Sequence, residues 1–205
     1  MSTITTPYDS IAGQYESARV GLQPKELQYL RVILEGLAPP STILDLGCGT
    51  GRPIATTLAG EGHCIVGVDA SEAMLALFRQ RLPGHRWIHG RIEEVELDEV
   101  FDAVICWDSL FHLQREHWPG VLRKIHAWLK PRGTLLLSSG GVVEGDYGFS
   151  DTMFDRVFYY DSLPPETLVQ LLEDLGFRVA LIEMCELPDG GRNKGKLATI
   201  ASGTG

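Results

Sequence analysis

Short apolar runs alternate with segments of helical periodicity from about residue 41 to the end of the chain. The runs expected to form parallel strands cover residues 42–46, 64–69, 86–89, 101–106 and 134–138. Parallel strands have to be joined by a crossover, usually a helix, and that helix then covers the sheet. The alternation therefore predicts an α/β fold of the Rossmann-like, doubly wound type, with a mostly parallel seven-stranded sheet and helices on both faces.

Three parts of the chain depart from this alternation. The last two apolar runs, 178–183 and 196–201, are separated by turn residues and predict an antiparallel hairpin at the edge of the sheet. Residues 1–40 precede the first strand, and residues 140–163 are rich in glycine and aromatic side chains. Segments at the carboxyl edge of such a sheet often cover a ligand. We therefore expect an N-terminal helical lid over 1–40 and an insert near the acceptor site over 140–163.

Length and charge restrict the class of protein. The chain has 205 residues, which fits one domain over residues 1–205. Its net charge of −9 counts against tight binding to nucleic acid, which needs a basic surface to displace counterions. No apolar stretch is long enough to cross a bilayer and no signal peptide is recognised, so we expect a cytoplasmic monomer or homodimer without a membrane partner. The four cysteines form no C-x-x-C pair and are expected to be reduced and buried.

A glycine-rich loop follows the first apolar run. Gly47, Gly49 and Gly51 stand at alternate positions directly before an expected helix. Glycine is needed where the backbone turns sharply or approaches a ligand closely, and a helix N-terminus favours a carboxylate or phosphate. Asp69 ends the second run, where an acidic side chain of a doubly wound fold accepts hydrogen bonds from ribose hydroxyls. These features predict a site for a nucleoside that carries an anionic group.

The spacing of the loop bears on which nucleoside binds. A dinucleotide site has the pattern G-x-G-x-x-G, whereas here the third glycine comes one residue early. Asp45 stands just before the loop, where a carboxylate would repel a pyrophosphate but attract an ammonium or sulfonium group. The sequence therefore favours a ligand with a cationic end over a nicotinamide dinucleotide.

Four motifs, in order, resemble those of the class I S-adenosylmethionine-dependent methyltransferases. Residues 45–51, Asp-Leu-Gly-Cys-Gly-Thr-Gly, match the first motif of that family, and residues 67–71 resemble its second-strand motif. Residues 101–105 resemble the fourth strand, and residues 129–135 resemble the turn into the fifth. The resemblance implies a single methyltransferase domain of the small-molecule type, with S-adenosyl-L-methionine as its cofactor.

The resemblance also implies which residues hold the cofactor. Asp45 and the glycine loop would face the methionine part, Asp69 would hold the ribose hydroxyls, and Ala70 or Met74 would lie against the adenine. The full expected set is Tyr15, Asp45, Gly47, Cys48, Gly49, Gly51, Asp69, Ala70, Met74, Arg91, Ile92 and Trp107.

The sequence leaves alternatives for two arginines, Arg91 and Arg19. Relatives often have an acidic residue after the third strand that contacts the adenine amine, but Arg91 stands at that place here. The contact would then come from the backbone of Ile92 or from Glu93. Arg19 could pair with the cofactor carboxylate, although an exposed surface position is favoured.

The acceptor side is expected to be built from residues after the fourth strand and from the two covering segments. His112 is the candidate general base, because histidine titrates near working pH; the alternative is a structural histidine bonded to backbone at the site wall. The remaining substrate-binding candidates are Tyr8, Asp108, Phe111, Tyr159 and Tyr160. Asp108 could instead cap a helix, and the tyrosines could serve packing. The histidines and cysteines lack metal-ligand spacing, so we expect no metal.

The function expected is in-line methyl transfer to a small-molecule acceptor. The alternatives are a protein- or nucleotide-directed methyltransferase, a nicotinamide-dependent Rossmann oxidoreductase, and a non-catalytic cofactor-binding subunit. Oxygen, nitrogen, carbon and sulfur acceptors all occur on this fold, so the sequence leaves the acceptor atom open.

Overall fold

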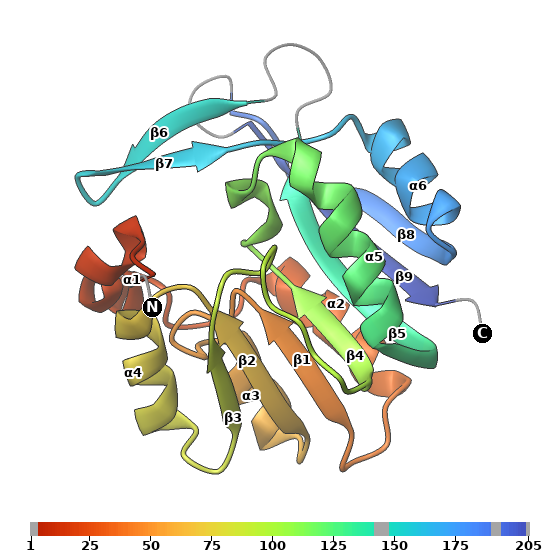
Figure 1. The fold of residues 1–205 in the computed structure, drawn as a ribbon, viewed down its shortest axis with the longest axis horizontal. Coiled ribbons are helices and arrows are strands. Elements are labelled where there is room, and N and C mark those ends of the chain that lie inside the picture. The colour runs from red at the N-terminus through yellow and green to blue at the C-terminus, as the bar shows by residue number, and fades with distance from the viewer. Residues whose placement is uncertain (1–3, 142–147, 190–193, 204–205) are drawn as a thin grey trace.

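The computed structural model describes residues 4–141, 148–189 and 194–203. Its main sheet has seven strands in the order β3-β2-β1-β4-β5-β9-β8 (Figure 1). β9 pairs antiparallel with both β5 and β8, and the other neighbouring strands pair parallel. The strands are β1 Thr42–Leu46, β2 Cys64–Asp69, β3 Arg86–His89, β4 Phe101–Cys106, β5 Leu129–Gly140, β8 Phe177–Glu186 and β9 Lys196–Gly203. The expected doubly wound sheet with an antiparallel C-terminal hairpin is confirmed.

Helices cover both faces of the sheet. One apolar cluster joins the sheet to α2 Pro24–Glu35, α3 Ile54–Gly60 and α4 Glu72–Arg81. The other joins it to α5 Trp118–Trp128 and α6 Pro165–Asp174. No described helix is long and apolar enough to cross a membrane.

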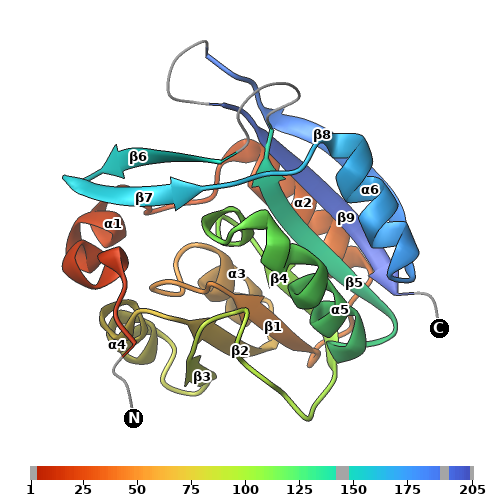
Figure 2. The same ribbon diagram turned by 45° about the horizontal axis from the view of Figure 1, so that its top comes forward.

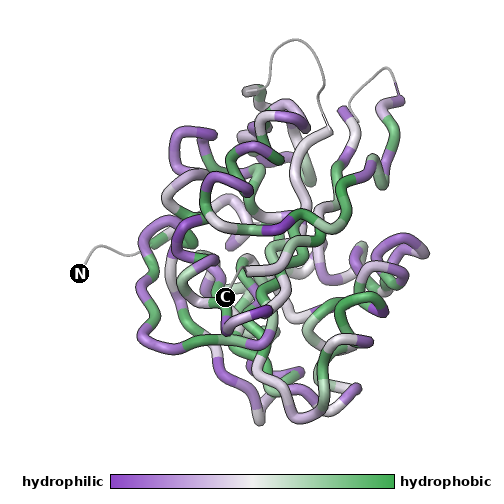
Figure 3. Tube along the Cα trace, turned by 90° about the vertical axis from the view of Figure 1, so that its right-hand side faces the viewer, coloured by the Kyte–Doolittle hydropathy of each residue, from purple (hydrophilic) through white to green (hydrophobic). Residues whose placement is uncertain are grey.

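The central strands are apolar at nearly every position because both of their faces are covered. In β1, Ile43 faces the cluster with α2, α3 and α4, while Leu44 faces the cluster with α5 and α6. Both side chains are fully buried. The hydrophobic stretches of the trace accordingly cross the middle of the molecule (Figure 3).

The helical lid expected over residues 1–40 begins with two short pieces and not with one continuous helix. A 3-10 turn, η1, covers Pro7–Ser10, and α1 covers Ala12–Ala18, with the buried Ile11 at the junction. The Asp9 carboxylate accepts hydrogen bonds from Ser71 Oγ at 2.7 Å and from Ala73 N at 3.3 Å. η1 is therefore docked on the N-terminus of α4, where a carboxylate is favourable.

The insert contains a hairpin that the sequence analysis does not predict. β6 Phe149–Met153 and β7 Arg156–Tyr160 form a separate two-stranded sheet, which lies over the same end of the main sheet as η1 and α1 (Figures 1 and 2). Its two-residue turn is Phe154–Asp155, with φ of +48° and +58°. The usual sequence signal for a two-residue hairpin turn is Asn-Gly or Asp-Gly, and this turn has neither. Residues 142–147 of the insert lie outside the described residues.

The expectation that every cysteine is buried holds fully for two of the four. Cys48 and Cys106 are buried and Cys185 is half-buried, but Cys64 is exposed. Cys64 is the first residue of β2, and the buried part of that strand begins only at Ile65. All four thiols are free.

Replacing Gly51 with alanine should destabilise the fold. Gly51 has φ of +79°, and a Cβ there would lie 2.8 Å from Phe78 Cδ2 and 3.2 Å from Leu82 Cδ1. Left-handed backbone and overpacking together predict a loss of about 2–4 kcal/mol in the free energy of unfolding, measured by urea titration. Gly60→Ala is the matched control, because a Cβ at that helical glycine meets nothing within 4 Å. Equal stability of the two variants would contradict the prediction.

Candidate functional site

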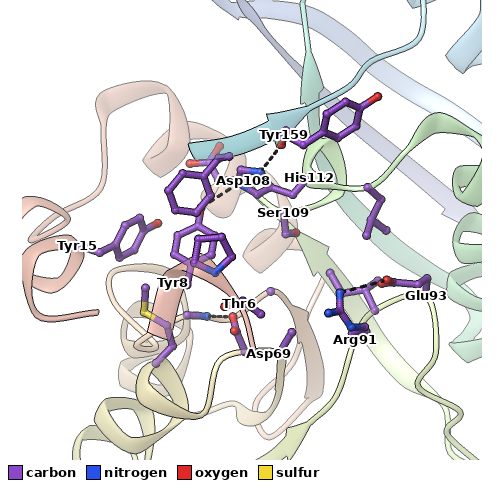
Figure 4. Close-up of a pocket in the computed structure, with 18 of the residues that line it drawn as sticks. Thr6, Tyr8, Tyr15, Asp69, Arg91, Glu93, Asp108, Ser109, His112 and Tyr159 are labelled. Atoms are coloured by element: carbon purple, nitrogen blue, oxygen red, sulfur yellow. Dashed lines mark hydrogen bonds and ion pairs between the residues drawn. The ribbon is translucent and has the colours of Figure 1, made fainter. Parts of the chain in front are cut away.

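A cavity of about 470 Å³ opens where β1, β2 and β4 end, beneath η1 and the β6–β7 hairpin (Figure 4). The carboxyl ends of parallel strands in a doubly wound sheet are the usual place for a ligand. Most of the residues singled out in the sequence line this cavity. They are Tyr8, Tyr15, Gly47, Gly49, Asp69, Ala70, Met74, Arg91, Ile92, Trp107, Asp108, His112 and Tyr159.

The remaining candidates lie elsewhere. Asp45 and Cys48 line a narrow recess of about 30 Å³ that shares Tyr15, Gly47 and Trp107 with the main cavity. Phe111 and Tyr160 line a separate cavity of about 290 Å³. Gly51 lines no described cavity. It packs against Phe78, on the side of the loop away from the cavity, and so it supports the conformation of the loop.

Several lining residues were not anticipated as site residues. They are Thr6, Pro7, Ser109, Leu113, Ser150, Val157 and Phe158. Thr6 and Pro7 adjoin Tyr8, and Ser109 adjoins Asp108, so sequence proximity to the candidates was an available signal. Ser150, Val157 and Phe158 reach the cavity through the hairpin; the sequence placed the insert near the acceptor site, but no local pattern singled out these three side chains.

The glycine loop holds its shape through close backbone contacts. Gly47 N and Cys48 N both donate to Val68 O, at 2.7 and 3.0 Å, which ties the loop to β2. A Cβ on Gly47 would lie 2.3 Å from Ser109 Cβ, so only glycine fits there. A Cβ on Gly49 would meet nothing nearer than Tyr15 Cε1 at 4.0 Å, which shows that its backbone faces open space.

Asp45 is a buried carboxylate without a partner. Its side chain is 4% exposed, and no described residue donates a hydrogen bond or ion pair to it. Burial, and then repulsion from Asp69, raises its pKa to about 7. A lone buried charge is unfavourable unless a cation pairs with it. The recess therefore fits a ligand group that carries positive charge.

Asp69 joins the glycine loop to the start of α4. Its Oδ2 accepts from Gly49 N and its Oδ1 accepts from Ser71 N, both at 2.8 Å. Burial raises its pKa to about 6, although these two backbone hydrogen bonds act in the opposite direction. Each oxygen keeps a lone pair for a ligand hydroxyl on the cavity side.

The favoured exposed position of Arg19 is wrong. Its side chain is only 17% exposed, because it pairs with the buried Glu26 carboxylate, Nη1 to Oε2 at 3.0 Å. The same carboxylate accepts from Trp107 Nε1 at 2.9 Å. A buried acid thus fixes both the arginine and the tryptophan at the cavity wall.

Asp108 is an ion-pair residue and no helix cap. Its carboxylate pairs with Lys196 Nζ at 2.9 Å and with Arg19 Nη2 at 3.5 Å. Its backbone is in the left-handed region, with φ of +54°, and its N–H donates to Ser138 Oγ at 2.7 Å. These contacts join the loop after β4 to β5, to β9 and to the N-terminal segment.

His112 is bonded at both ring nitrogens. Nδ1 lies 2.9 Å from Tyr159 O, and Nε2 lies 2.8 Å from the Tyr8 hydroxyl (Figure 4). Burial lowers its pKa below the ordinary value, although the bond to the Tyr159 carbonyl acts in the opposite direction. The bond to backbone expected of a structural histidine is thus present, and the second nitrogen still reaches a cavity-lining hydroxyl.

Arg91 and Glu93 both line the cavity and form an ion pair with each other at 3.8 Å. Ile92 lies between them in the chain and is buried. The acidic side chain at this part of the cavity therefore stands two residues after Arg91, and Arg91 partly neutralises it.

Comparison with known proteins identifies the family. Residues 43–133 match the model of a methyltransferase domain. A Geobacillus sp. (strain WCH70) protein that carries the name of a methyltransferase is 31% identical over 178 residues, covering 81% of this chain and 69% of that protein. YqeM of Bacillus subtilis (strain 168), similarly named, is 31% identical over 163 residues, covering 74% of this chain and 66% of YqeM.

The chain belongs to the class I S-adenosylmethionine-dependent methyltransferases. Its fold also matches a solved S-adenosylmethionine-dependent methyltransferase from Methanosarcina mazei, with a TM-score of 0.73 at 19% identity, over 90% of this chain and 99% of that one. The chain spans about two thirds of the length of the two bacterial relatives it matches.

Asp45 should make the stability of the ligand-free methyltransferase depend on pH. Its pKa of about 7 in the fold exceeds the ordinary value of 3.8, so the folded protein binds the extra proton. The stabilising contribution is therefore full below about pH 4 and is lost as the pH rises to about 7. Relative to Asp45→Asn, the wild type should lose about 1.4 kcal/mol per pH unit within that window, measured by urea unfolding.

Asp102→Asn is the matched control with the opposite sign. Asp102 accepts from Lys130 Nζ at 2.9 Å and from Thr42 N at 2.8 Å. Burial acts to raise its pKa, but these contacts outweigh it and the pKa is lowered. The stabilisation that Asp102→Asn removes should hence be largest at neutral pH and vanish in acid. If the difference in the free energy of unfolding between the wild type and Asp45→Asn did not change between pH 4 and 7, Asp45 would not be a buried, unpaired acid.

Proposed function

We propose that this methyltransferase moves a methyl group from S-adenosyl-L-methionine to a small-molecule acceptor, within a single domain over residues 1–205. The observation that carries the proposal is the buried, unpaired Asp45 carboxylate beside the glycine loop. It is chemically matched to the ammonium group of a methionine moiety. A phosphate in the same recess would be repelled.

The cavity offers a partner for each further part of the cofactor. Asp69 would accept hydrogen bonds from the ribose hydroxyls, with Ala70, Met74 and Ile92 against the adenine. The open face of the backbone at Gly49 would receive the methionine part. Tyr15 and Trp107 line both the recess and the main cavity, so they would lie beside the cofactor where it passes from one to the other.

The chain's residues would contribute mainly by positioning. Bound S-adenosyl-L-methionine supplies a methyl group on a sulfonium, whose leaving group is a neutral thioether that needs no acid. Holding a nucleophile in line can supply much of the rate enhancement. Tyr8, Tyr15 and Phe158 form an aromatic wall of the cavity, which would lie at the acceptor end. His112 is the candidate to receive a proton from the acceptor.

A small-molecule acceptor is supported by the covering segments and by relatives. η1 and the β6–β7 hairpin are linked by Arg156 Nε donating to Ser10 Oγ at 2.8 Å, so they roof the cavity together. Phosphoethanolamine N-methyltransferase of Triticum aestivum is 26% identical over 182 residues, covering 86% of this chain and 35% of that enzyme. Ubiquinone biosynthesis O-methyltransferase of Rickettsia canadensis (strain McKiel) is 24% identical over 169 residues, covering 76% and 70%.

A protein acceptor is the second candidate. A probable protein arginine N-methyltransferase of Oryza sativa is 32% identical, but over only 103 residues, which cover 47% of this chain and 27% of that protein. That match leaves out more than half of this chain, whereas the small-molecule relatives match most of it.

Cofactor binding and transfer can be tested separately. Calorimetry with S-adenosyl-L-methionine should show binding that strengthens as the pH rises to about 7, because only ionised Asp45 attracts the ammonium. Asp45→Asn should weaken binding about 10- to 100-fold and flatten this dependence. Asp102→Asn serves as control, since Asp102 lines no described cavity and should leave affinity unchanged. Binding of NAD without binding of S-adenosyl-L-methionine would overturn the proposal.

The acceptor is then sought with methyl-labelled cofactor and an extracted metabolite pool, followed by identification of the labelled product. Label in a small molecule is expected. Label found only in protein would favour the second candidate, and intact cofactor binding without any labelled product would indicate a non-catalytic subunit.

A further inference from the structure

The hydrogen bonds of His112 fix where its proton sits. A carbonyl oxygen only accepts, so the 2.9 Å contact to Tyr159 O requires a hydrogen on Nδ1. Burial favours the neutral ring, which carries one hydrogen in total. Nε2 is therefore bare, and at 2.8 Å it accepts the hydroxyl hydrogen of Tyr8.

This arrangement leaves no ring nitrogen of His112 open to an acceptor molecule. Nδ1 is committed to Tyr159, and Nε2 is covered by Tyr8. The Tyr8 oxygen gives its hydrogen to Nε2 and keeps lone pairs on a side chain that lines the cavity. Within this pair, the group able to accept a hydrogen bond from the acceptor is hence the Tyr8 hydroxyl.

We propose that Tyr8 is the catalytic residue that takes the acceptor's proton, and that His112 acts behind it as the final proton acceptor. The inference rests on the proposed function. An acceptor X–H gives its proton to Tyr8 Oη while the Tyr8 proton moves to His112 Nε2. The electron pair of X forms the bond to the methyl carbon, and the carbon–sulfur bond breaks with its pair left on sulfur. The substrate class implied is a molecule whose methylated atom carries hydrogen, a hydroxyl or an amine.

The surroundings of His112 suit a charge that appears only during the reaction. The ring is enclosed by Phe111 at 4.8 Å, Tyr160 at 4.9 Å and Phe158 at 5.8 Å between centroids. This burial keeps the ring neutral in the resting protein, whereas the Asp108 carboxylate acts in the opposite direction and favours the imidazolium once it forms.

The ionisable groups that face the pair come from four elements. Asp108 precedes His112 in the loop after β4, and Asp69 ends β2; both carboxylates act on Tyr8. Tyr15 lies on α1, 5.8 Å from the Tyr8 ring, and Tyr160 lies on β7. Burial raises the pKa of Tyr8 well above its usual range, so the phenol passes a proton on without becoming an anion in the resting protein.

Two variants separate transfer of a proton from packing. Tyr8→Phe keeps the ring beside Tyr15 and Phe158 but removes the oxygen. His112→Gln keeps an oxygen that can accept from Tyr8 but removes the basic nitrogen. The probes are phenol and phosphoethanolamine, whose acceptor atoms carry hydrogen, and octanoate, whose carboxylate does not.

Both variants should lower kcat about 10²- to 10³-fold with whichever hydrogen-bearing probe is methylated, while the Kd for S-adenosyl-L-methionine stays unchanged. His112→Gln should also abolish the decrease of kcat at low pH, because glutamine cannot be protonated. His126→Gln is the control, since that histidine lies on α5 and contacts Gly176 O, away from the cavity. An equal loss of octanoate turnover in Tyr8→Phe would reduce Tyr8 to a packing role and overturn the inference.

A measurement without turnover keeps the two proposals apart. Nitrogen NMR of histidine-labelled protein should show His112 as the neutral tautomer with hydrogen on Nδ1, and Tyr8→Phe should shift Nε2. If no probe is methylated, the acceptor proposal fails for those probes while the spectrum still decides the proton pathway. Hydrogen on Nε2, or a ring already cationic at neutral pH, would overturn the inference.

Discussion

The carboxylate of Asp69 is the interaction on which the site depends. Its two oxygens hold Gly49 N in the loop after β1 and Ser71 N at the start of α4. Ser71 in turn caps α4 by accepting from Met74 N and donates to Asp9 of η1. One buried acid thereby fixes the positions of the loop, the helix and the N-terminal segment relative to one another. Without it, these three segments would need other contacts to hold the same arrangement.

Two buried acids close together make the ligand-free site electrostatically unfavourable. The charge of Asp69 makes Asp45 harder to ionise, and only Asp69 has backbone donors that offset its burial. A cation beside Asp45 and hydroxyls beside Asp69 relieve both deficits at once. The unpaired negative charge of the ligand-free site thus favours binding of a cationic ligand. This charge distinguishes the site from the phosphate-binding glycine loops that it resembles.

The sequence predicted the donor side better than the acceptor side, for a physical reason. Gly49, Asp69 and Ser71 lie within 23 positions of one another and follow local rules of loops, strand ends and caps. Tyr8 and His112 are 104 positions apart, so their hydrogen bond had no local signature. Arg19 was expected at the surface because a charged side chain is usually exposed. The sequence did not indicate that a buried carboxylate, Glu26, would pair with it. The hairpin escaped prediction since Phe154 and Asp155 adopt a left-handed turn without glycine.

The docking of η1 on α4 divides the cavity between different parts of the chain. Its floor is built by the loops after β1 and β2, whereas Tyr8 and its neighbours reach it from the first described residues. Substitutions around Tyr8 are therefore expected to reshape the cavity wall while leaving the loops after β1 and β2 in place. In the proposed arrangement, such modularity would let natural variation explore new acceptors without first rebuilding the part of the protein that would recognise the methyl donor.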